Sequence, residues 1–367
     1  MVASGTQAPN GLDGLLGACV RLASGEGRGA LATVARRRGS LPMSATAKML
    51  VTEHGTRLGT VGGGCLEAEI IARAREVLVR GTPVISEHTL NAGAAGDYGL
   101  TCGGTAVMFI EPVFPDAHLA EVYAGCARLM QGDERGILAT GIDWSGGSAK
   151  LLVHAGVQVG RGDARMTSAA LALDPRGEEP RFDGEVLLET IAGRPRLVVF
   201  GGGHVGARVA EAAAFAGWRV TIVDDRPEFS DHARAPFAEQ AITADYRDAA
   251  SVVAFDADSY VVVATRGHEH DAIVMDQLVR RDLRYLGMLG SRRKVALTWT
   301  LLESWGVGRE ALDRVHAPVG LAIGADTPEE IAVSVVAEMI AARRQRSRRR
   351  GVSCRSDGAS SAGAYPL

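Results

Sequence analysis

The sequence lacks a long apolar run and lacks an excess of charge of either sign. It contains no stretch of roughly 18 apolar residues, so we expect no membrane-spanning helix. Its 40 lysine and arginine residues face 43 aspartate and glutamate residues, which gives a formal net charge of −3. A nucleic-acid-binding protein normally carries a clear basic excess. The composition therefore predicts neither a membrane span nor nucleic-acid binding.

The sequence also lacks a cysteine framework. Its cysteines number five, an odd count, and no Cys-x-x-Cys occurs, so a disulfide scaffold and a zinc ribbon are both unsupported. The first ten residues do not show the basic and then apolar segments of a signal peptide. We therefore expect a cytoplasmic protein whose cysteines stay free thiols. Cys19 and Cys126 fall on expected helices and are interpreted as small buried hydrophobic residues.

Glycine, in contrast, is abundant, with 46 residues in a chain of 367. That is about one residue in eight, against an average near 7%. Hydrophobic residues at 46% and charged residues at 23% are typical of a globular protein. The glycine excess indicates either loose loops or backbone that approaches a ligand closely.

The pattern of apolar residues predicts an α/β protein with two domains. Residues 11–175 mix helices and strands and form an expected N-terminal α+β domain with two cysteine motifs. Residues 176–194, rich in proline, glycine and charge, are the expected linker. Residues 195–343 alternate strand and helix, which predicts a Rossmann-like parallel sheet with helices on both faces. Residues 344–367 are an arginine-rich tail that we expect to be disordered.

A glycine fingerprint lies at the start of the second domain. Gly201, Gly203 and Gly206 follow an expected strand, open an expected helix, and precede Asp224 at the end of the next strand. Gly201 permits a tight turn, Gly203 lets the backbone approach a pyrophosphate, and Gly206 lets the helix pack on the strand. Asp224 is expected to accept a hydrogen bond from a ribose hydroxyl. The fingerprint fits NAD, FAD and a pterin dinucleotide alike, and a Rossmann-like sheet that binds nothing is the plainer alternative.

Two further turns follow expected strands of the same domain, where such sheets bind ligands. The turn 265–271 contains Arg266 and His268, and ordinary polar loop residues are the alternative interpretation. The turn 290–294 contains Ser291, Arg292 and Lys294. Cations at a helix start oppose the helix dipole, so this turn favours a bound anion. Neither turn supplies a full metal-ligand set, and we assign no metal site.

Two cysteine motifs distinguish the N-terminal domain. Cys65 follows three glycines at an expected helix start, a position that lowers the pKa of a thiol, and Glu67 lies in the first turn of that helix. Cys102 precedes Gly103 and Gly104 before an expected strand. Uncrowded thiols of this kind suit a soft metal or a sulfur ligand. Cys65, Cys102 and Glu67 are therefore the candidates for handling a soft metal or sulfur.

With these motifs in family order over nearly the whole chain, the sequence resembles the XdhC/CoxI family of xanthine dehydrogenase accessory proteins. The matching pieces are 63–67, 102–104, 200–206 (which includes His204), 223–227, 265–268, 287–294 and 320–334. Gly62 stands where the family often has serine, and the region 114–193 is weakly matched.

The resemblance implies a molybdenum-cofactor chaperone more readily than an enzyme. Such proteins bind the mature cofactor, in its mononucleotide or dinucleotide form, protect it during sulfuration and insert it into a molybdenum hydroxylase. The implied partners are the apo-hydroxylase and an L-cysteine desulfurase, and members are often homodimers. Cys65 or Cys102 is then a possible contact of the molybdenum end. The alternatives are an NAD(P)-dependent oxidoreductase and a nucleotide-binding scaffold that docks partners.

Overall fold

The computed structural model describes residues 11–41, 43–90 and 103–349. The chain divides into two compact units, residues 1–194 (unit 1) and residues 195–367 (unit 2). Each unit has its own sheets and its own apolar core. Among the described residues, no helix has both the length and the apolar character that crossing a membrane would require.

The first half of unit 1 is an antiparallel sheet, sheet A, with strand order β3-β2-β1-β5-β4. Its elements are α1 (Leu12–Ala23), β1 (Gly29–Gly39), β2 (Lys48–Thr52), β3 (Arg57–Gly59), α2 (Gly64–Arg80), β4 (Val84–Leu90) and β5 (Gly104–Val113). Side chains alternate between the two faces of a strand. Ala30 and Ala32 of β1 accordingly pack with α2, whereas Leu31 packs with α1.

The second half of unit 1 is another antiparallel sheet, sheet B, with strand order β8-β7-β6-β10-β9. Its elements are α4 (Ala117–Gln131), β6 (Arg135–Gly141), β7 (Lys150–His154), β8 (Val157–Arg161), α5 (Ala164–Ala172), β9 (Arg181–Phe182) and β10 (Val186–Ala192). The expected linker, residues 176–194, therefore contains two strands of unit 1 instead. Buried apolar residues of β10, such as Leu187 and Ile191, hold this segment in the unit.

The two halves of unit 1 have the same order of elements and the same order of strands. Residues 19–33 and 126–140 share nine of 15 residues at a constant offset of 107. Gly29 and Gly136 occupy equivalent places, because a Cβ atom would meet Leu22 Cδ1 at 2.8 Å in one half and Leu129 Cδ1 at 2.7 Å in the other. Unit 1 is therefore an internal repeat of one α/β motif.

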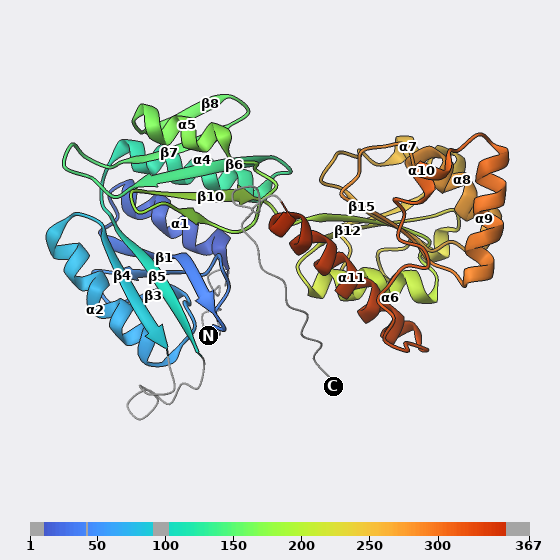
Figure 1. Cartoon of the computed structure of the whole chain (residues 1–367), viewed down its shortest axis with the longest axis horizontal. Helices are drawn as coiled ribbons and strands as arrows, with labels where there is room; N and C mark the ends of the chain where they lie inside the picture. The colour runs from blue at the N-terminus through green and yellow to red at the C-terminus, as the bar shows by residue number, and fades with distance from the viewer. Residues whose placement is uncertain (1–10, 42, 91–102, 350–367) are drawn as a thin grey trace, which may run out of the picture. The chain divides into compact units, whose positions relative to one another are not determined.

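The core of unit 1 lies between its two sheets. Helices α1 and α4 pack against each other there, together with buried leucines from both sheets (Figure 1). Helix α2 covers the outer face of sheet A through residues such as Ile70 and Val77. Helix α5 covers the outer face of sheet B through Met166 and Ala170.

Unit 2 is a parallel sheet, sheet C, with strand order β13-β12-β11-β14-β15. Its strands are β11 (Arg196–Phe200), β12 (Arg219–Asp224), β13 (Gln240–Thr243), β14 (Tyr260–Val263) and β15 (Tyr285–Met288). Its helices are α6 (His204–Phe215), η1 (Pro227–Phe229), η2 (Tyr246–Asp248), α7 (Ala249–Val252), α8 (His268–Leu278), α9 (Arg292–Ser304), α10 (Arg309–Leu312) and α11 (Pro328–Arg349).

Helices cover both faces of sheet C. Helices α6 and α11 pack on one face, and helices α7 to α10 pack on the other (Figure 1). The expected Rossmann-like architecture is confirmed. Helix α11 continues through residues 344–349, so the first part of the expected tail is helical, and residues 350–367 lie outside the described residues.

Candidate functional site

The strand order of sheet C fixes where a ligand can bind. The chain connections reverse direction between β11 and β14, and ligands of such sheets bind beyond the carboxyl ends of the strands at this reversal. The turn 201–203 follows β11, and the turn 264–267 follows β14. The glycine fingerprint and the turn that carries Arg266 and His268 are thus brought together at one edge.

The three fingerprint glycines differ in what a side chain at each position would contact. Gly201 has a φ of +107°, and a Cβ atom there would collide with the Ala264 carbonyl oxygen. A Cβ atom at Gly206 would collide with the Gly201 carbonyl oxygen, so glycine lets α6 pack close to the turn. A Cβ atom at Gly203 would meet no atom within 4 Å. Protein packing therefore requires glycine at two of the three positions, while Gly203 faces open space.

The sequence interpretation did not assign a role to Gly202. A Cβ atom there would collide with the Phe229 carbonyl oxygen, so the turn also approaches η1 closely. The run of three consecutive glycines was the signal that could have pointed to this contact.

Two helices begin at this edge without a side-chain cap. Gly203 precedes α6 and Gly267 precedes α8, and neither offers a side-chain acceptor to the first turn. Helix α9 differs, because the Ser291 hydroxyl accepts a hydrogen bond from the Lys294 backbone N–H at 3.3 Å. Uncapped N–H groups at a helix start attract anions. The starts of α6 and α8 therefore suit a phosphate group.

Asp224 is fully buried, and its carboxylate is occupied by the protein's own donors. It accepts hydrogen bonds from the Gly202 backbone N–H at 2.9 Å and from Arg226 through the backbone N–H, Nε and Nη2 at 3.0, 2.9 and 3.1 Å. These donors lower the pKa of the carboxyl group despite its burial. In this structure Asp224 holds the glycine turn, and a ribose hydroxyl would have to displace Arg226 to reach it.

Arg266 bridges two neighbouring turns at this edge. Its Nη1 atom lies 2.6 Å from Asp225 Oδ1, and its Nη2 atom lies 3.0 Å from His270 Nε2. His204 and His268 are exposed as the first residues of α6 and α8. The structure thus places two imidazoles and one guanidinium around the two uncapped helix starts.

The cations at the start of α9 have different environments. Lys294 Nζ lies 2.5 Å from Oδ2 of the fully buried Asp271, whose Oδ1 accepts from the Thr265 hydroxyl at 2.6 Å. Burial nevertheless raises the pKa of Asp271. A buried carboxylate therefore offsets the charge of Lys294, which weakens the sequence argument that this turn needs a bound anion. Arg292 is exposed.

A cavity of about 470 Å³ adjoins these turns. It is lined by Val205 of α6, by Leu289, Gly290 and Ser291 after β15, by residues 319 and 321–325, and by Ile331 and Ser334 of α11. Cavities of a few hundred Å³ hold small molecules, and this lining is mainly apolar. The sequence interpretation named Ser291 as a site residue and also proposed the glycine loops 287–290 and 320–324, which contribute to this lining, as contact loops of the ligand site.

In unit 1, three consecutive glycines with positive φ lead into α2, namely Gly62, Gly63 and Gly64 (the first residue of the helix) at +118°, +77° and +65°. Glu67 Oε1 holds this turn by accepting from the Thr60 hydroxyl at 2.5 Å and from the Val61 and Gly63 backbone N–H groups at 3.2 Å each. These bonds lower the pKa of Glu67 although partial burial opposes the shift. Glu67 therefore caps the helix start and fixes the backbone on which Cys65 sits.

Of the two cysteine candidates, the structure describes only the backbone position of Cys65, in the first turn of α2. Cys102 lies outside the described residues. Gly104, two residues after it, is packed so tightly that a Cβ atom would lie 2.7 Å from the Arg38 carbonyl oxygen. No group of three or more His, Cys, Asp or Glu side chains is arranged to hold a metal ion in the part of the chain that the structure describes.

The interpretation of Cys19 and Cys126 as buried residues is confirmed, because both are fully buried free thiols. They occupy equivalent positions in the two halves of unit 1. Burial raises the pKa of each thiol to about 12, so neither is a nucleophile at neutral pH.

Comparison with known families matches both units. A model described as the XdhC Rossmann domain matches residues 197–339, and a model described as the XdhC and CoxI family matches residues 22–89. The first match spans sheet C and the turns at its carboxyl edge. The second spans sheet A from β1 to β4 and includes the Cys65 turn.

Individual relatives cover most of the chain. A protein from Bacillus subtilis (strain 168) that is named as a probable xanthine dehydrogenase component is 28% identical over 330 residues, which are 86% of this chain and 93% of that protein. The molybdenum cofactor insertion chaperone PaoD of Escherichia coli (strain K12) is 25% identical over 323 residues, 86% of this chain and 84% of PaoD. A crystal structure of a xanthine dehydrogenase from Bacillus halodurans has the same fold, with a TM-score of 0.71 at 24% identity, over 92% of this chain and 97% of that one.

Proposed function

Because this chain belongs to the XdhC and CoxI family, we propose that it binds the molybdenum cofactor as cargo and delivers it to a molybdenum hydroxylase of the xanthine dehydrogenase type. The name of PaoD as a molybdenum cofactor insertion chaperone supports this role. On this proposal the protein is an accessory protein and not itself a hydroxylase.

Among the structural observations, the open space at Gly203 supports the proposal most directly. Gly203 directly precedes the uncapped start of α6 and faces open space, so a phosphate group can approach the backbone without meeting a side chain at that position. N–H groups at helix starts bind phosphate well. The cavity beside Val205 offers a mainly apolar surface next to this phosphate site. A nucleotide form of the cofactor has a pyrophosphate for the first feature and a planar pterin for the second.

We propose a separate role for each functional residue at the carboxyl edge of sheet C. Asp224 positions the glycine turn through Gly202 and Arg226. Arg266 is 42% exposed in its side chain and is proposed to contact the phosphates together with His204 and His268. Ser291, Arg292 and Lys294 are proposed to contribute from the start of α9, where Lys294 also neutralises Asp271.

Unit 1 is proposed to handle the reactive end of the cargo. Cys65 and Cys102 are the candidates to contact molybdenum or to relay sulfur during sulfuration. Glu67 would act as a positioning residue, because its three hydrogen bonds fix the turn before Cys65. An L-cysteine desulfurase is the proposed sulfur source, and a homodimer in the cytoplasm is the proposed assembly.

The decisive experiment measures what the purified protein carries. Expressed in a host that makes the cofactor, the protein should co-purify with molybdenum and should release a fluorescent pterin after oxidation. Tight NAD(H) binding without pterin, and a change in nicotinamide absorbance with substrate, would replace the proposal by an oxidoreductase. Partner binding with neither ligand would indicate a scaffold.

Single substitutions then assign the site. Gly203→Val should reduce the bound pterin at least tenfold, because its side chain fills the space beside the phosphate, whereas Gly146→Val places the same side chain in open space in a turn of unit 1 and serves as a control. Cys65→Ala and Cys102→Ala should each be assayed for transfer of active cofactor to the apo-hydroxylase. A variant that binds and transfers at full yield removes that cysteine from the proposed role.

A further inference from the structure

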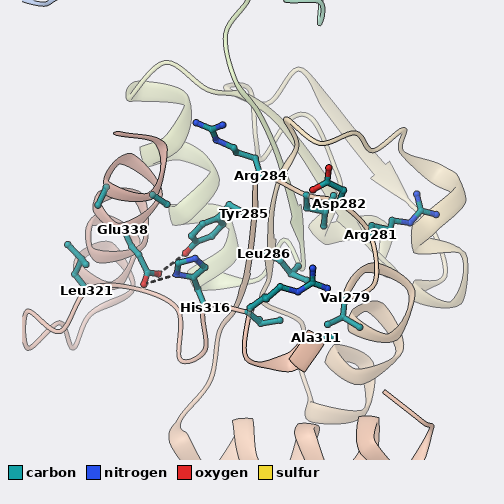
Figure 2. Close-up of a pocket in the computed structure, with 15 residues that line it drawn as sticks. Val279, Arg281, Asp282, Arg284, Tyr285, Leu286, Ala311, His316, Leu321 and Glu338 are labelled. Carbon is teal, nitrogen blue, oxygen red and sulfur yellow. Dashed lines mark hydrogen bonds and ion pairs between the residues drawn. The ribbon is translucent and has the colours of Figure 1, made fainter. Parts of the chain in front are cut away.

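A second cavity, of about 500 Å³, lies at the other end of β15. It is lined by residues of the turn before β15, by Tyr285 and Leu286 of the strand, by the segment 314–316 and by Glu338 of α11 (Figure 2). The segment that ends at His316 extends the sheet, because His316 forms a bridge with Gly287. Nothing in the proposed function uses this cavity.

Three polar side chains converge at one wall of this cavity. Glu338 accepts hydrogen bonds from the Tyr285 hydroxyl at 2.7 Å and from the Gly320 backbone N–H at 2.8 Å, and it pairs with His316 Nδ1 at 3.2 Å. Figure 2 shows the three side chains pointing toward one another. The His316 ring also stacks on the Tyr285 ring, with centroids 4.4 Å apart.

This arrangement fixes the orientation of the imidazole. The bonds to Glu338 lower the pKa of its carboxyl group to about 2, so Glu338 is ionised at neutral pH and accepts a hydrogen bond from the Nδ1–H group of His316. His316 Nε2 makes no hydrogen bond with any residue that the structure describes, and the residue is 37% exposed in its side chain. Glu338 therefore leaves Nε2 as the ring atom available to a ligand.

Three arginines line the cavity together with two carboxylates, Asp282 and Glu338. Arg281, Arg284 and Arg314 line it, and none of them forms an ion pair within the described ranges of the chain. Arg284 is only 8% exposed, and its guanidinium donates to a backbone carbonyl, that of Arg343, at 3.3 Å. Arg314 is exposed. A buried cation without a counter-charge is costly, so a bound anion would stabilise this region.

We propose that this cavity binds a small organic anion that carries carboxylate or phosphate groups. Arg314 and Arg284 supply the charge, and the aliphatic residues Val279, Leu283 and Leu286 contact the carbon part. Because Nδ1 of His316 carries the ring proton, Nε2 is an acceptor and takes a hydrogen bond from a hydroxyl group of the ligand. The volume is in the range of small-molecule sites. The site is separate from the phosphate site at the carboxyl edge, so its test does not depend on the cargo.

The cavity is also coupled to the carboxyl edge through one segment. Leu321 lines both cavities, and the preceding residue, Gly320, is held by Glu338. Gly320 has a φ of +105°, and a Cβ atom there would collide with the Ser334 hydroxyl. A ligand against His316 and Glu338 therefore acts on the segment 320–325 that borders the proposed cargo site.

Isothermal titration of the full chain tests the proposal with two probes, citrate for carboxylates and glycerol 3-phosphate for phosphates. At least one probe should bind with a Kd below about 1 mM, which corresponds to about 4 kcal/mol. The probe that binds identifies the anionic group. Arg314→Met should weaken binding at least tenfold, and Arg280→Met should not, because Arg280 is a neighbouring exposed arginine outside the cavity lining.

A second measurement, NMR of the unmodified protein, tests for binding without relying on a variant that could fold differently. The imidazole proton signal of His316, identified by its loss in His316→Asn, should shift on titration with the probe in the unmodified protein. If neither probe binds, or if binding persists unchanged in both Arg314→Met and His316→Asn, the proposal is overturned.

Discussion

Lys48 of sheet A and Glu189 of sheet B form a buried ion pair with 2.5 Å between Nζ and Oε1, although 141 residues separate them in sequence. Lys48 also donates to the Thr33 hydroxyl at 2.9 Å. The other half of unit 1 repeats this arrangement in the opposite direction. Lys150 of sheet B pairs with Glu111 of sheet A at 2.8 Å and donates to the Thr140 hydroxyl at 2.6 Å. Each half therefore supplies one lysine and one glutamate to the other.

Lys48→Met is expected to destabilise unit 1 strongly, because it leaves the Glu189 carboxylate buried and unpaired. Loss of one member of a buried pair costs about 3–5 kcal/mol. Urea denaturation gives the free energy of unfolding, and hydrogen exchange assigns the loss to unit 1. The double variant Lys48→Met/Glu189→Leu should recover most of the loss.

Lys150→Met is the matched variant in the other half and should behave like Lys48→Met. An exposed pair serves as the reference, and Arg73→Met, which removes an i,i+3 pair with Glu76, should cost less than about 1 kcal/mol. A loss below about 1 kcal/mol in both lysine variants would show that the buried pairs do not hold the sheets together.

Cys19 and Cys126 should resist alkylation in the folded protein. Their thiols are buried, and a pKa of about 12 keeps them protonated at pH 8, whereas the thiolate is the reactive form. Mass spectrometry after iodoacetamide treatment should show both peptides unmodified in buffer and modified in urea. Modification in buffer at the rate seen in urea would contradict the burial.

Gly206→Ala and Gly203→Ala should separate packing from ligand binding. The Gly206 substitution forces a methyl group against the Gly201 carbonyl oxygen and should destabilise unit 2 by about 1–3 kcal/mol. The methyl group at position 203 meets open space, so the free energy of unfolding should stay within about 0.5 kcal/mol of its original value. Thermal and urea denaturation measure both, and equal losses in the two variants would remove the argument that Gly203 is reserved for a ligand.

Glu338→Gln should change how stability depends on pH. The folded pKa of Glu338, about 2, lies below its ordinary value of 4.5, so the carboxylate stabilises the fold above pH 4.5. That contribution, on the order of 2–3 kcal/mol, is lost as pH falls from 4.5 toward 2. Denaturation at a series of pH values should show the Gln variant less stable at pH 6, with the gap narrowing in acid. A gap that stays constant down to pH 3 would contradict the assignment.

The sequence sufficed to predict unit 2, because its strands are short apolar runs that end in glycine turns. Gly201, Gly206 and the alternation of strand and helix determine the parallel sheet locally. The boundary of unit 1 was not predictable in this way. Residues 176–194 look like a linker by composition, but Leu187 and Ile191 pair β10 with β6, and this pairing depends on residues far away in the sequence.

The sequence interpretation missed the internal repeat of unit 1, although residues 19–33 and 126–140 align without a gap and could have revealed it. At the candidate site, the positions of the glycines followed from their spacing, whereas the side-chain contacts did not. Asp224 was expected to face a ligand and is instead bonded to Arg226, and Lys294 is bonded to Asp271. Spacing shows which residues share an edge of the sheet, but it does not show which charges neutralise each other there.

The repeat in unit 1 has an evolutionary consequence. When one gene encodes both copies of a homodimer, every substitution appears in each copy, so a reactive loop is present twice or not at all. Here the two halves are joined in one chain, and each changes independently. The first half keeps a glycine turn and a cysteine at the start of α2, whereas the first turn of α5 carries Ala164 and Arg165 and no cysteine. The paired lysines and glutamates preserve the architecture that the two halves share. The first half could therefore acquire its glycine turn and cysteine without a matching change in the second half.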